Sequence, residues 1–326
     1  MDFQPTEDQQ HLRAGVRDLL AGRYGREALR ASVDAAADGG AGAGAGDAGA
    51  GGAAGVDRAL WRELGGAGFF ALRLPESEGG VGLGLPEAVL VFEEAGRALV
   101  PGPLVATHLA AGVVPGAADG TAVVTAFDLD GPLVAHLADA DAVLGAAAVP
   151  AGEPVRSVDP LTPLHRVAAA GDVSAYRATG ALLTAALQLG SALRTVELAV
   201  RYAGEREQFG QPIGAFQAVK HLCARMLVRA EVARTAVYAA AVTGDPGEGA
   251  AAKLLADEAA VQGARDCLQV HGGMGFTWEA DVHLHLKRAW VRAEQWRTAA
   301  QAQELLAEEL LAEALLAEEL PATAAP

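Results

Sequence analysis

Two segments carry residue types that could bind a charged, partly aromatic cofactor. The first reads REQFGQPIGAFQ from Arg206 to Gln217 and lies between two stretches with helical periodicity. Arg206 stands where one helix is expected to end, and a guanidinium there can make paired, charge-assisted hydrogen bonds to a diphosphate. Phe209 offers a flat face to an adenine or another ring. The residues also fit a plain helix end with a solvated arginine and a buried phenylalanine, and composition alone favours that simpler interpretation.

The second segment, QVHGGMGFT, begins at Gln269 and directly follows another helical stretch. Gly272 and Gly273 could let a ligand approach bare backbone amides. Paired glycines here are also typical of a helix C-cap, where a left-handed φ angle requires the absence of a Cβ. We expect His271 to be structural, because no acid or nucleophile stands near it in the sequence.

Helices must position both segments. Residues 1–116 predict an N-terminal helical domain that begins with a capping box at Thr6 and Gln9. Within this domain, residues 33–55 are almost entirely Ala, Gly and Asp. Such a run can bury little apolar surface, so we expect a low-complexity surface loop. A glycine-rich phosphate loop is the alternative, but no strand precedes the run and no Lys-Ser/Thr follows it.

The remainder of the chain divides into a β-rich part and a helical part. Residues 117–175 contain short β-branched and apolar runs cut by prolines, and they predict a small central β module. Residues 176–326 predict long antiparallel helices and therefore a four-helix bundle. The fourth helical region, 280–320, contains LLAEELLAEALLAEEL, which we interpret as a packing face with Glu on its solvent side. The expected fold is mainly α with a small, reduced middle β domain.

Composition limits the partners and the compartment. Half of the 326 residues are apolar and the net charge is −16, so no basic excess is available to bind nucleic acid. Cys223 and Cys267 fit a reducing compartment and lack the spacing of a metal site. The polar start MDFQPTEDQQ does not resemble a secretory signal, and no uncharged stretch reaches the length of a membrane span. We expect a soluble, cytoplasmic protein without a metal, a nucleic-acid partner or a membrane segment.

The order and spacing of these motifs resemble the acyl-CoA dehydrogenase family. REQFGQPIGAFQ, followed after one helix by QVHGGMGFTWEADVHLHLKRA, is similar to that family's C-terminal domain, and LWRELGGAGFFALRLPESEGGVGLGLPEAVLVFEEAGRAL resembles its N-terminal helical domain. The resemblance implies FAD-dependent oxidation of the Cα–Cβ bond of an acyl-CoA thioester. In that reaction a carboxylate removes the α proton and the β hydrogen leaves as hydride to the flavin. It also implies a homo- or hetero-tetramer, usually a dimer of dimers.

The resemblance implies FAD contacts at six positions of this chain. They are Arg206, Phe209, Gln217, Gln269, Gly272 and Gly273. Arg206 and Phe209 match an arginine and a phenylalanine that contact the FAD of the neighbouring subunit. Gln217 matches a further FAD contact, and the other three match the segment that holds the diphosphate and adenosine side.

The chain departs from the family pattern where the flavin ring and the catalytic base belong. The middle module contains neither the GxGSD-like loop nor the Trp-Ile-Thr/Ser segment that the family places against the ring. The usual base, a Glu after the HGG segment, aligns with Trp296, and the alternative position on the first bundle helix aligns with Gly180. Glu294 is the remaining candidate and would require a rearranged turn. A positioned general base typically contributes a factor of ~10²–10⁴ to the reaction rate, so a chain without one is not expected to catalyse the reaction alone.

Several functions therefore stay open. The chain could be a complete acyl-CoA dehydrogenase, or the short, degenerate subunit of a heterotetramer that completes the FAD site of an active partner, which its pattern resembles slightly more. A flavin oxidase or hydroxylase of the same fold and a homologue that has lost flavin are the alternatives. No motif specifies the acyl group or the electron acceptor.

Overall fold

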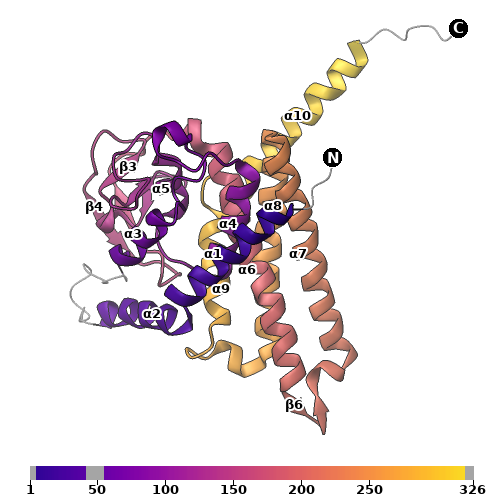
Figure 1. The fold of residues 1–326 in the computed structure, drawn as a ribbon. Helices are drawn as coiled ribbons and strands as arrows, with labels where there is room; N and C mark the ends of the chain where they lie inside the picture. Colours follow the sequence, from indigo (N-terminus) through magenta and orange to yellow (C-terminus); the bar gives the residue numbers. More distant parts are fainter. Residues whose placement is uncertain (1–4, 42–54, 320–326) are drawn as a thin grey trace, which may run out of the picture.

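The computed structural model describes residues 5–41 and 55–319, which form three parts in chain order (Figure 1). The first part consists of α1 (Glu7–Arg23), α2 (Arg26–Ala41), α3 (Arg58–Gly66), the 3-10 turn η1 (Glu76–Glu78), α4 (Leu85–Arg97) and α5 (Leu104–Ala110). The capping box before α1 is present, because Thr6 Oγ1 accepts from the Gln9 N–H and the Gln9 side chain accepts from the Thr6 N–H. Local capping thus sets the start of α1 as the sequence predicts.

The low-complexity loop predicted over residues 33–55 is wrong for its first part. Helix α2 continues through residues 33–41, and the Val33 side chain is fully buried. Alanine has the highest helix propensity, so an Ala-rich run extends a helix that is already nucleated by the better-patterned residues before it. Residues 42–54 of the predicted loop lie outside the described residues.

The middle part is a small β module. Its strands are β1 (Val124–Ala126), β2 (Leu133–Ala135), β3 (Ala142–Leu144), β4 (Gly152–Val155) and β5 (Leu164–Val167), with the 3-10 turn η2 (Leu137–Asp139) between β2 and β3. Strand β1 pairs with β3 in parallel, whereas β2, β5 and β4 form an antiparallel sheet in that order. The Thr125 hydroxyl donates to the Ala135 carbonyl at 2.6 Å and so links the two sheets.

The third part is a helical bundle. Its elements are α6 (Ser174–Glu205), β6 (Glu207–Gln208), β7 (Gln211–Pro212), η3 (Ile213–Ala215), α7 (Gln217–Thr243), α8 (Pro246–His271), η4 (Gly272–Phe276), α9 (Val282–Ala293) and α10 (Ala299–Glu319). The mainly α fold with a small β module is confirmed. Among the described residues, no helix combines the length and apolarity that a membrane span requires.

The expected fourth helix of the bundle is divided, and the interpretation of its leucine repeat is wrong. The chain breaks between α9 and α10 at residues 294–298, where Trp296 adopts a positive φ of 62°. Beyond the bundle, Leu310, Leu311 and Leu315 are exposed rather than packed against the protomer. A leucine pair every five residues places successive pairs about 140° apart around a helix, so the repeat does not form a single packing face.

Close helix packing joins α4 to the bundle. A Cβ at Gly96 of α4 would overlap the Leu187 backbone of α6. A Cβ at Gly190 of α6 would overlap the Glu93 backbone of α4. Only glycine at these two positions permits so close an approach of the helices.

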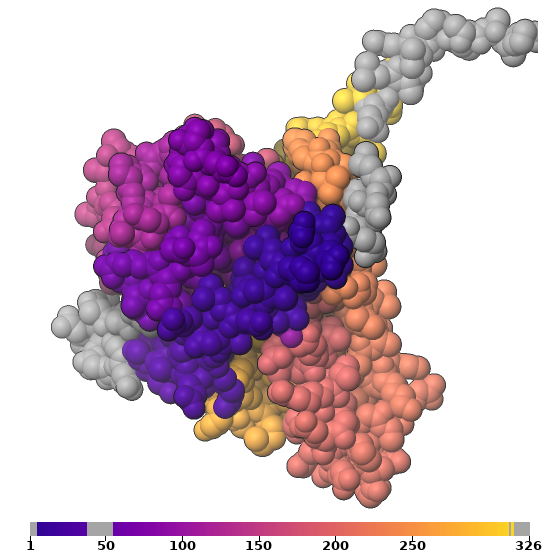
Figure 2. All heavy atoms as spheres, in the orientation of Figure 1, coloured from indigo at the N-terminus to yellow at the C-terminus, as the bar shows by residue number. Residues whose placement is uncertain are grey.

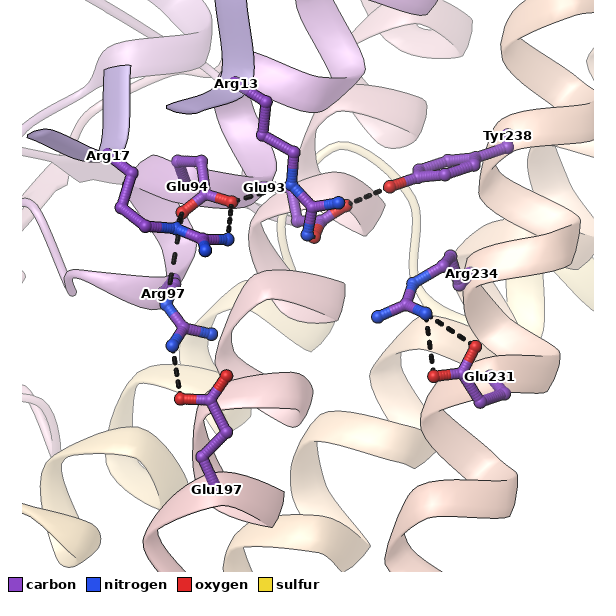
Figure 3. A network of polar contacts seen from close by, with 9 residues as sticks. All are labelled: Arg13, Arg17, Glu93, Glu94, Arg97, Glu197, Glu231, Arg234 and Tyr238. Atoms are coloured by element: carbon purple, nitrogen blue, oxygen red, sulfur yellow. Dashed lines mark hydrogen bonds and ion pairs between the residues drawn. The ribbon is translucent and has the colours of Figure 1, made fainter. Parts of the chain in front are cut away.

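A polar network crosses the same helices (Figure 3). Glu93 and Glu94 of α4 are buried, and they pair with Arg13 and Arg17 of α1. Burial would raise the pKa of Glu94, but hydrogen bonds from Arg17 and Arg13 outweigh it and leave that pKa lowered. Both carboxylates therefore hold α1 against α4.

Tyr238 of α7 extends this network into the bundle. Its hydroxyl donates to Glu93 at 2.7 Å (Figure 3). Burial raises the pKa of Glu93, although Arg13 and Tyr238 act in the opposite direction. On the other side of the network, Arg97 of α4 pairs with Glu197 of α6. The network therefore fixes α1 and α4 to the bundle.

Candidate functional site

The hairpin between α6 and α7 presents the first candidate segment at one end of the bundle (Figure 1). Helix α6 ends at Glu205 with Arg206 as its C-cap, and the Ile213 N–H donates to the Arg206 carbonyl at 2.8 Å to close the hairpin. Phe209 and Gly210 form its tip with φ angles of 56° and 80°. Phe209 is 92% exposed, and its ring meets that of Phe216 edge to face with the ring centroids 6.0 Å apart.

This backbone conformation is unfavourable for Phe209. A left-handed conformation costs roughly 1–2 kcal/mol for a residue with a Cβ, and hairpin tips of this kind favour Asn or Gly. Exposing an aromatic ring to water adds to the disadvantage. Strain and exposure together at one residue are typical of functional positions rather than of positions selected for stability.

The end of α8 brings the second candidate segment to the same end of the bundle. The Tyr202 ring of α6 stacks on the His271 ring of α8 with centroids 4.2 Å apart, and His271 Nδ1 lies 2.8 Å from the Cys267 carbonyl oxygen. His271 thus ties the two helix ends together. Burial lowers its pKa, which favours the neutral ring.

The two glycines of this segment differ in what the fold requires of them. Gly272 caps α8 with a φ of 59°, and its N–H donates to the Gln269 carbonyl. The cap alone explains a glycine at this position. A Cβ on Gly273 would meet no atom within 4 Å among the described residues, so packing in the protomer gives no reason for glycine there.

All six predicted cofactor residues are exposed at this end, which we call the hairpin end. Arg206, Phe209, Gln217, Gln269, Gly272 and Gly273 are its members. Figure 2 shows that this end of the bundle stands clear of the N-terminal helices. A guanidinium, a flat ring and uncovered backbone can together hold a diphosphate and an adjacent base. The residues present therefore fit the adenosine diphosphate part of FAD.

Glu294 does not lie with these residues. It caps the C-terminus of α9 and is exposed, whereas the hairpin end lies near the N-terminus of that helix, which follows Gly272 and Gly273 in the chain. The 12 residues of α9 correspond to ~18 Å at 1.5 Å per residue. Buried Lys253 Nζ holds the end of α9 by donating to the carbonyls of Arg292 and Ala293, while its charge pairs with Asp257.

The two positions that align with the family's catalytic base are in direct contact. Trp296 is buried, and a Cβ added at Gly180 of α6 would overlap its indole ring. An aromatic ring therefore occupies the space beside position 180, and a carboxylate side chain at either position would require removal of that ring. Neither residue supplies a base.

The middle module closes directly onto the Trp296 turn. The Trp296 N–H donates to the Asp128 carbonyl at 2.5 Å, and Gln295 Nε2 donates to Asp128 Oδ2 at 2.8 Å. Leu129 and Gln295 also form an isolated antiparallel bridge. Asp128 Oδ1 is buried without a hydrogen-bond partner within the described structure, and burial raises the pKa of Asp128 to about 7.

Further hydrogen bonds extend this junction, which we call the closed junction (residues 127–131 with residues 294–301). Gln301 Nε2 donates to Asp130 at 2.9 Å, and Arg177 donates to the Trp296 carbonyl at 3.3 Å. A flavin ring and a thioester could enter between these segments only if the hydrogen bonds were broken. The residues at the closed junction therefore do not fit a bound flavin ring.

The closed junction cannot be predicted from the sequence because its partners are far apart in the chain. Asp128 and Gln295 are 167 positions apart, and no local pattern pairs them. The one available signal is the acidic turn DLDG after the predicted first strand, with Asp128 and Asp130 two residues apart.

Comparison with protein families and curated proteins identifies the chain. Residues 6–124 match the acyl-CoA dehydrogenase N-terminal domain and residues 178–312 match the acyl-CoA dehydrogenase C-terminal domain. A relative named acyl-CoA dehydrogenase IpdE2, from Mycobacterium tuberculosis, is 37% identical over 309 residues that cover 87% of this chain and 92% of the relative. The chain belongs to the acyl-CoA dehydrogenase family. It is an enzyme of the acyl-CoA dehydrogenase type, and the resemblance of its motifs is confirmed.

Solved structures agree on the fold of this acyl-CoA dehydrogenase. One subunit of the Tcur3481-Tcur3483 steroid acyl-CoA dehydrogenase, a G363A variant, superimposes with a TM-score of 0.78 at 24% identity, covering 95% of this chain and 99% of that chain. A chain of the ChsE4-ChsE5 complex from Mycobacterium tuberculosis gives 0.76 at 24% identity with the same coverage. At this identity the likeness establishes the fold alone.

Proposed function

We propose that this chain is a subunit of a FAD-dependent acyl-CoA dehydrogenase that acts on the Cα–Cβ bond of acyl-CoA thioesters together with another chain. Its hairpin end binds the adenosine diphosphate part of a FAD whose ring site and catalytic base belong to that other chain. FAD, when bound, accepts the hydride that leaves Cβ. The residues of this chain bind and orient the cofactor.

The contrast between the two ends of the bundle carries this proposal. At the hairpin end, Phe209 is exposed on a strained turn beside the exposed guanidinium of Arg206. At the closed junction, Trp296 fills the space beside Gly180, and Asp128 hydrogen-bonds to Gln295 and so fixes the Trp296 turn against the middle module. A protomer with an open cofactor end and a filled catalytic end is suited to complete a neighbour's site.

The comparisons favour a second chain as the neighbour. Two of the superimposed structures carry names that pair two proteins, Tcur3481 with Tcur3483 and ChsE4 with ChsE5. A complete enzyme with Glu294 as its base is less favoured, because Glu294 is exposed at the far end of α9 from the hairpin end.

The visible absorption spectrum tests the proposal. The chain is purified alone and after co-expression with an acyl-CoA dehydrogenase encoded beside it. Bound flavin is measured from its visible absorption band, together with dye-linked activity on acyl-CoAs. We expect flavin and activity only with the partner. Arg206→Ala should lower the flavin content of the complex, whereas Arg62→Ala, an exposed arginine of α3, should not.

Two results would contradict the proposal. Yellow, active protein without a partner would show that this chain alone binds the flavin ring and supplies the catalytic base. Absence of flavin under both conditions would indicate a homologue that has lost the cofactor.

A further inference from the structure

Helix α9 carries three basic side chains on its buried face. His285, Arg288 and Arg292 are three and four residues apart, so they lie on the same side of the helix. Each is at most 4% exposed. His285 Nδ1 lies 2.7 Å from Ser191 Oγ of α6, and Arg288 Nη1 donates to the carbonyl of Val100, just after α4, at 3.2 Å. This face of α9 therefore packs into the interior against α6 and the end of α4.

The charges on this face do not balance. A fully buried lysine or arginine normally has an acidic partner. In the part of the chain that the structure describes, three such side chains are buried, namely Lys253, Arg288 and Arg292. Lys253 pairs with Asp257, and Arg288 pairs with Asp159. Arg292 forms no ion pair with any described residue.

Asp159 does not supply the missing charge. Its carboxylate already accepts hydrogen bonds from Arg288 Nε, from the Thr162 hydroxyl at 2.6 Å and from the Leu161 N–H at 3.1 Å. Burial and the like charge of Arg288 lower the pKa of Arg292 well below its usual value, and Asp159 offsets this only in part. Because a guanidinium stays protonated in proteins, Arg292 requires another counter-charge.

The two guanidiniums also have unused hydrogen-bonding capacity. Arg288 Nη2 is buried without a partner among the described residues. Arg292 Nη1 reaches the Leu187 carbonyl only at 3.4 Å, which is long for a hydrogen bond. Burial and four arginines, among them Arg288 and Arg292, lower the pKa of His285 to about 3, so this ring is neutral in a positively charged region. Excess positive charge and free N–H donors together are what an anion-binding site requires.

We propose that a small monovalent anion of the size of chloride binds in the protein interior between Arg288 and Arg292. It accepts from Arg288 Nη2 and from the Arg292 guanidinium. One unpaired positive charge calls for one negative charge, and the burial of both side chains leaves no room for the remainder of a phosphate ester or a fatty acid.

The anion would fix the C-terminal half of α9 against α6. Arg292 lies two residues before Glu294, where the closed junction begins, so the bound ion also stabilises the helix end that holds the Trp296 turn. This role goes beyond cofactor binding and does not depend on FAD. A failure of this proposal would therefore leave the cofactor proposal unaffected.

Thermal unfolding of the full chain in sodium chloride and in sodium gluconate at equal ionic strength tests the site. Gluconate is too large to enter it. We expect a higher Tm in chloride, by roughly 3–4 °C when the anion is about a hundredfold above its Kd. Arg292→Met should abolish this difference and raise the Tm in gluconate, because it removes an unpaired buried charge. Arg225→Met, at an exposed arginine of α7, is the matched control and should keep the chloride effect.

Anomalous diffraction from crystals grown in sodium bromide locates the ion directly. We expect a bromide peak between Arg288 and Arg292 in the wild type and none there in Arg292→Met. The proposal is overturned if the wild type shows no such peak or unfolds at the same Tm in chloride and gluconate. It is also overturned if Arg292→Met keeps the full chloride effect, or if it lowers the Tm equally in both salts, since the protein alone would then hold the guanidinium.

Discussion

Asp128→Asn should remove a large part of the pH dependence of stability. Asp128 lies in the closed junction, with one oxygen bonded to Gln295 and the other buried without a partner among the described residues. Burial raises its pKa from the ordinary value of 3.8 to about 7 in the folded chain. Between these values the folded state holds a proton that the unfolded state has released, so stability falls as the pH rises through this window.

The size of the effect follows from the shift. Each pKa unit corresponds to about 1.4 kcal/mol, so the full window corresponds to about 4 kcal/mol. Between pH 5 and pH 8 about 3 kcal/mol of this is accessible to measurement. Above pH 7 the folded state carries the full cost of burying the Asp128 carboxylate with only one of its oxygens hydrogen-bonded. Below pH 4 this cost disappears because Asp128 is protonated in both the folded and the unfolded state.

Urea denaturation at several pH values between 5 and 8, followed by tryptophan fluorescence, measures this effect. The Asn variant should be more stable than the wild type by about 1.5 kcal/mol at pH 5, and this difference should grow by about 3 kcal/mol between pH 5 and pH 8. Asp130→Asn, in the same turn, retains Asp128 and should follow the wild-type profile. Parallel profiles of the wild type and Asp128→Asn would refute the assignment.

Three further predictions concern packing, charge and strain. Gly180→Ala should lower the free energy of unfolding by about 2 kcal/mol because its methyl group overlaps the Trp296 ring, and Trp296→Ala in the same chain should cancel most of that added cost. Arg13→Ala should cost about 3 kcal/mol, because it leaves the buried carboxylate of Glu93 without its cation. Phe209→Asn should raise protomer stability by about 1 kcal/mol through relief of the left-handed φ, while lowering the flavin content of the complex with its partner. Urea denaturation measures the three stability effects, and absorbance measures flavin.

Each of these changes has a matched control. Gly204→Ala, on the same helix as Gly180, adds a methyl group to open space and should not destabilise the chain. Arg23→Ala removes an exposed ion pair with Glu63 and should cost less than about 1 kcal/mol. Phe276→Asn removes an exposed ring at a residue without a positive φ, so it should bring no gain in stability. Equal effects in a variant and its control would contradict the corresponding argument.

The sequence predicts the elements whose pattern is local. The capping box at Thr6 and the long bundle helices follow from residues a few positions apart. The end of helix α2 does not follow from low complexity, because alanine favours a helix even where glycine and aspartate surround it. The leucine pairs of α10 suggest burial, but Leu310, Leu311 and Leu315 are exposed within the described part of the chain.

The candidate site shows a similar division. The six residues of the hairpin end follow from resemblance, and the structure places them on one exposed end, while their contacts with FAD stay a prediction. The absence of a carboxylate at Gly180 and Trp296 can be read from the sequence. Their mutual contact cannot, because it joins α6 to a turn far along the chain and depends on tertiary packing alone.

That contact bears on how the two ends of the bundle came to differ. A Glu at position 180 would have to share its space with the Trp296 ring, so regaining a base there requires the loss of the indole first. A Glu at position 296 would require the middle module to release the turn that Asp128 and Gln295 now hold. Either single replacement disturbs packing before it can supply chemistry. Packing does not fix Phe209 in this way, since its ring is exposed and its backbone is strained. Stability therefore maintains the closed junction, whereas the exposed and strained hairpin tip is a feature that the proposed binding to another molecule would explain.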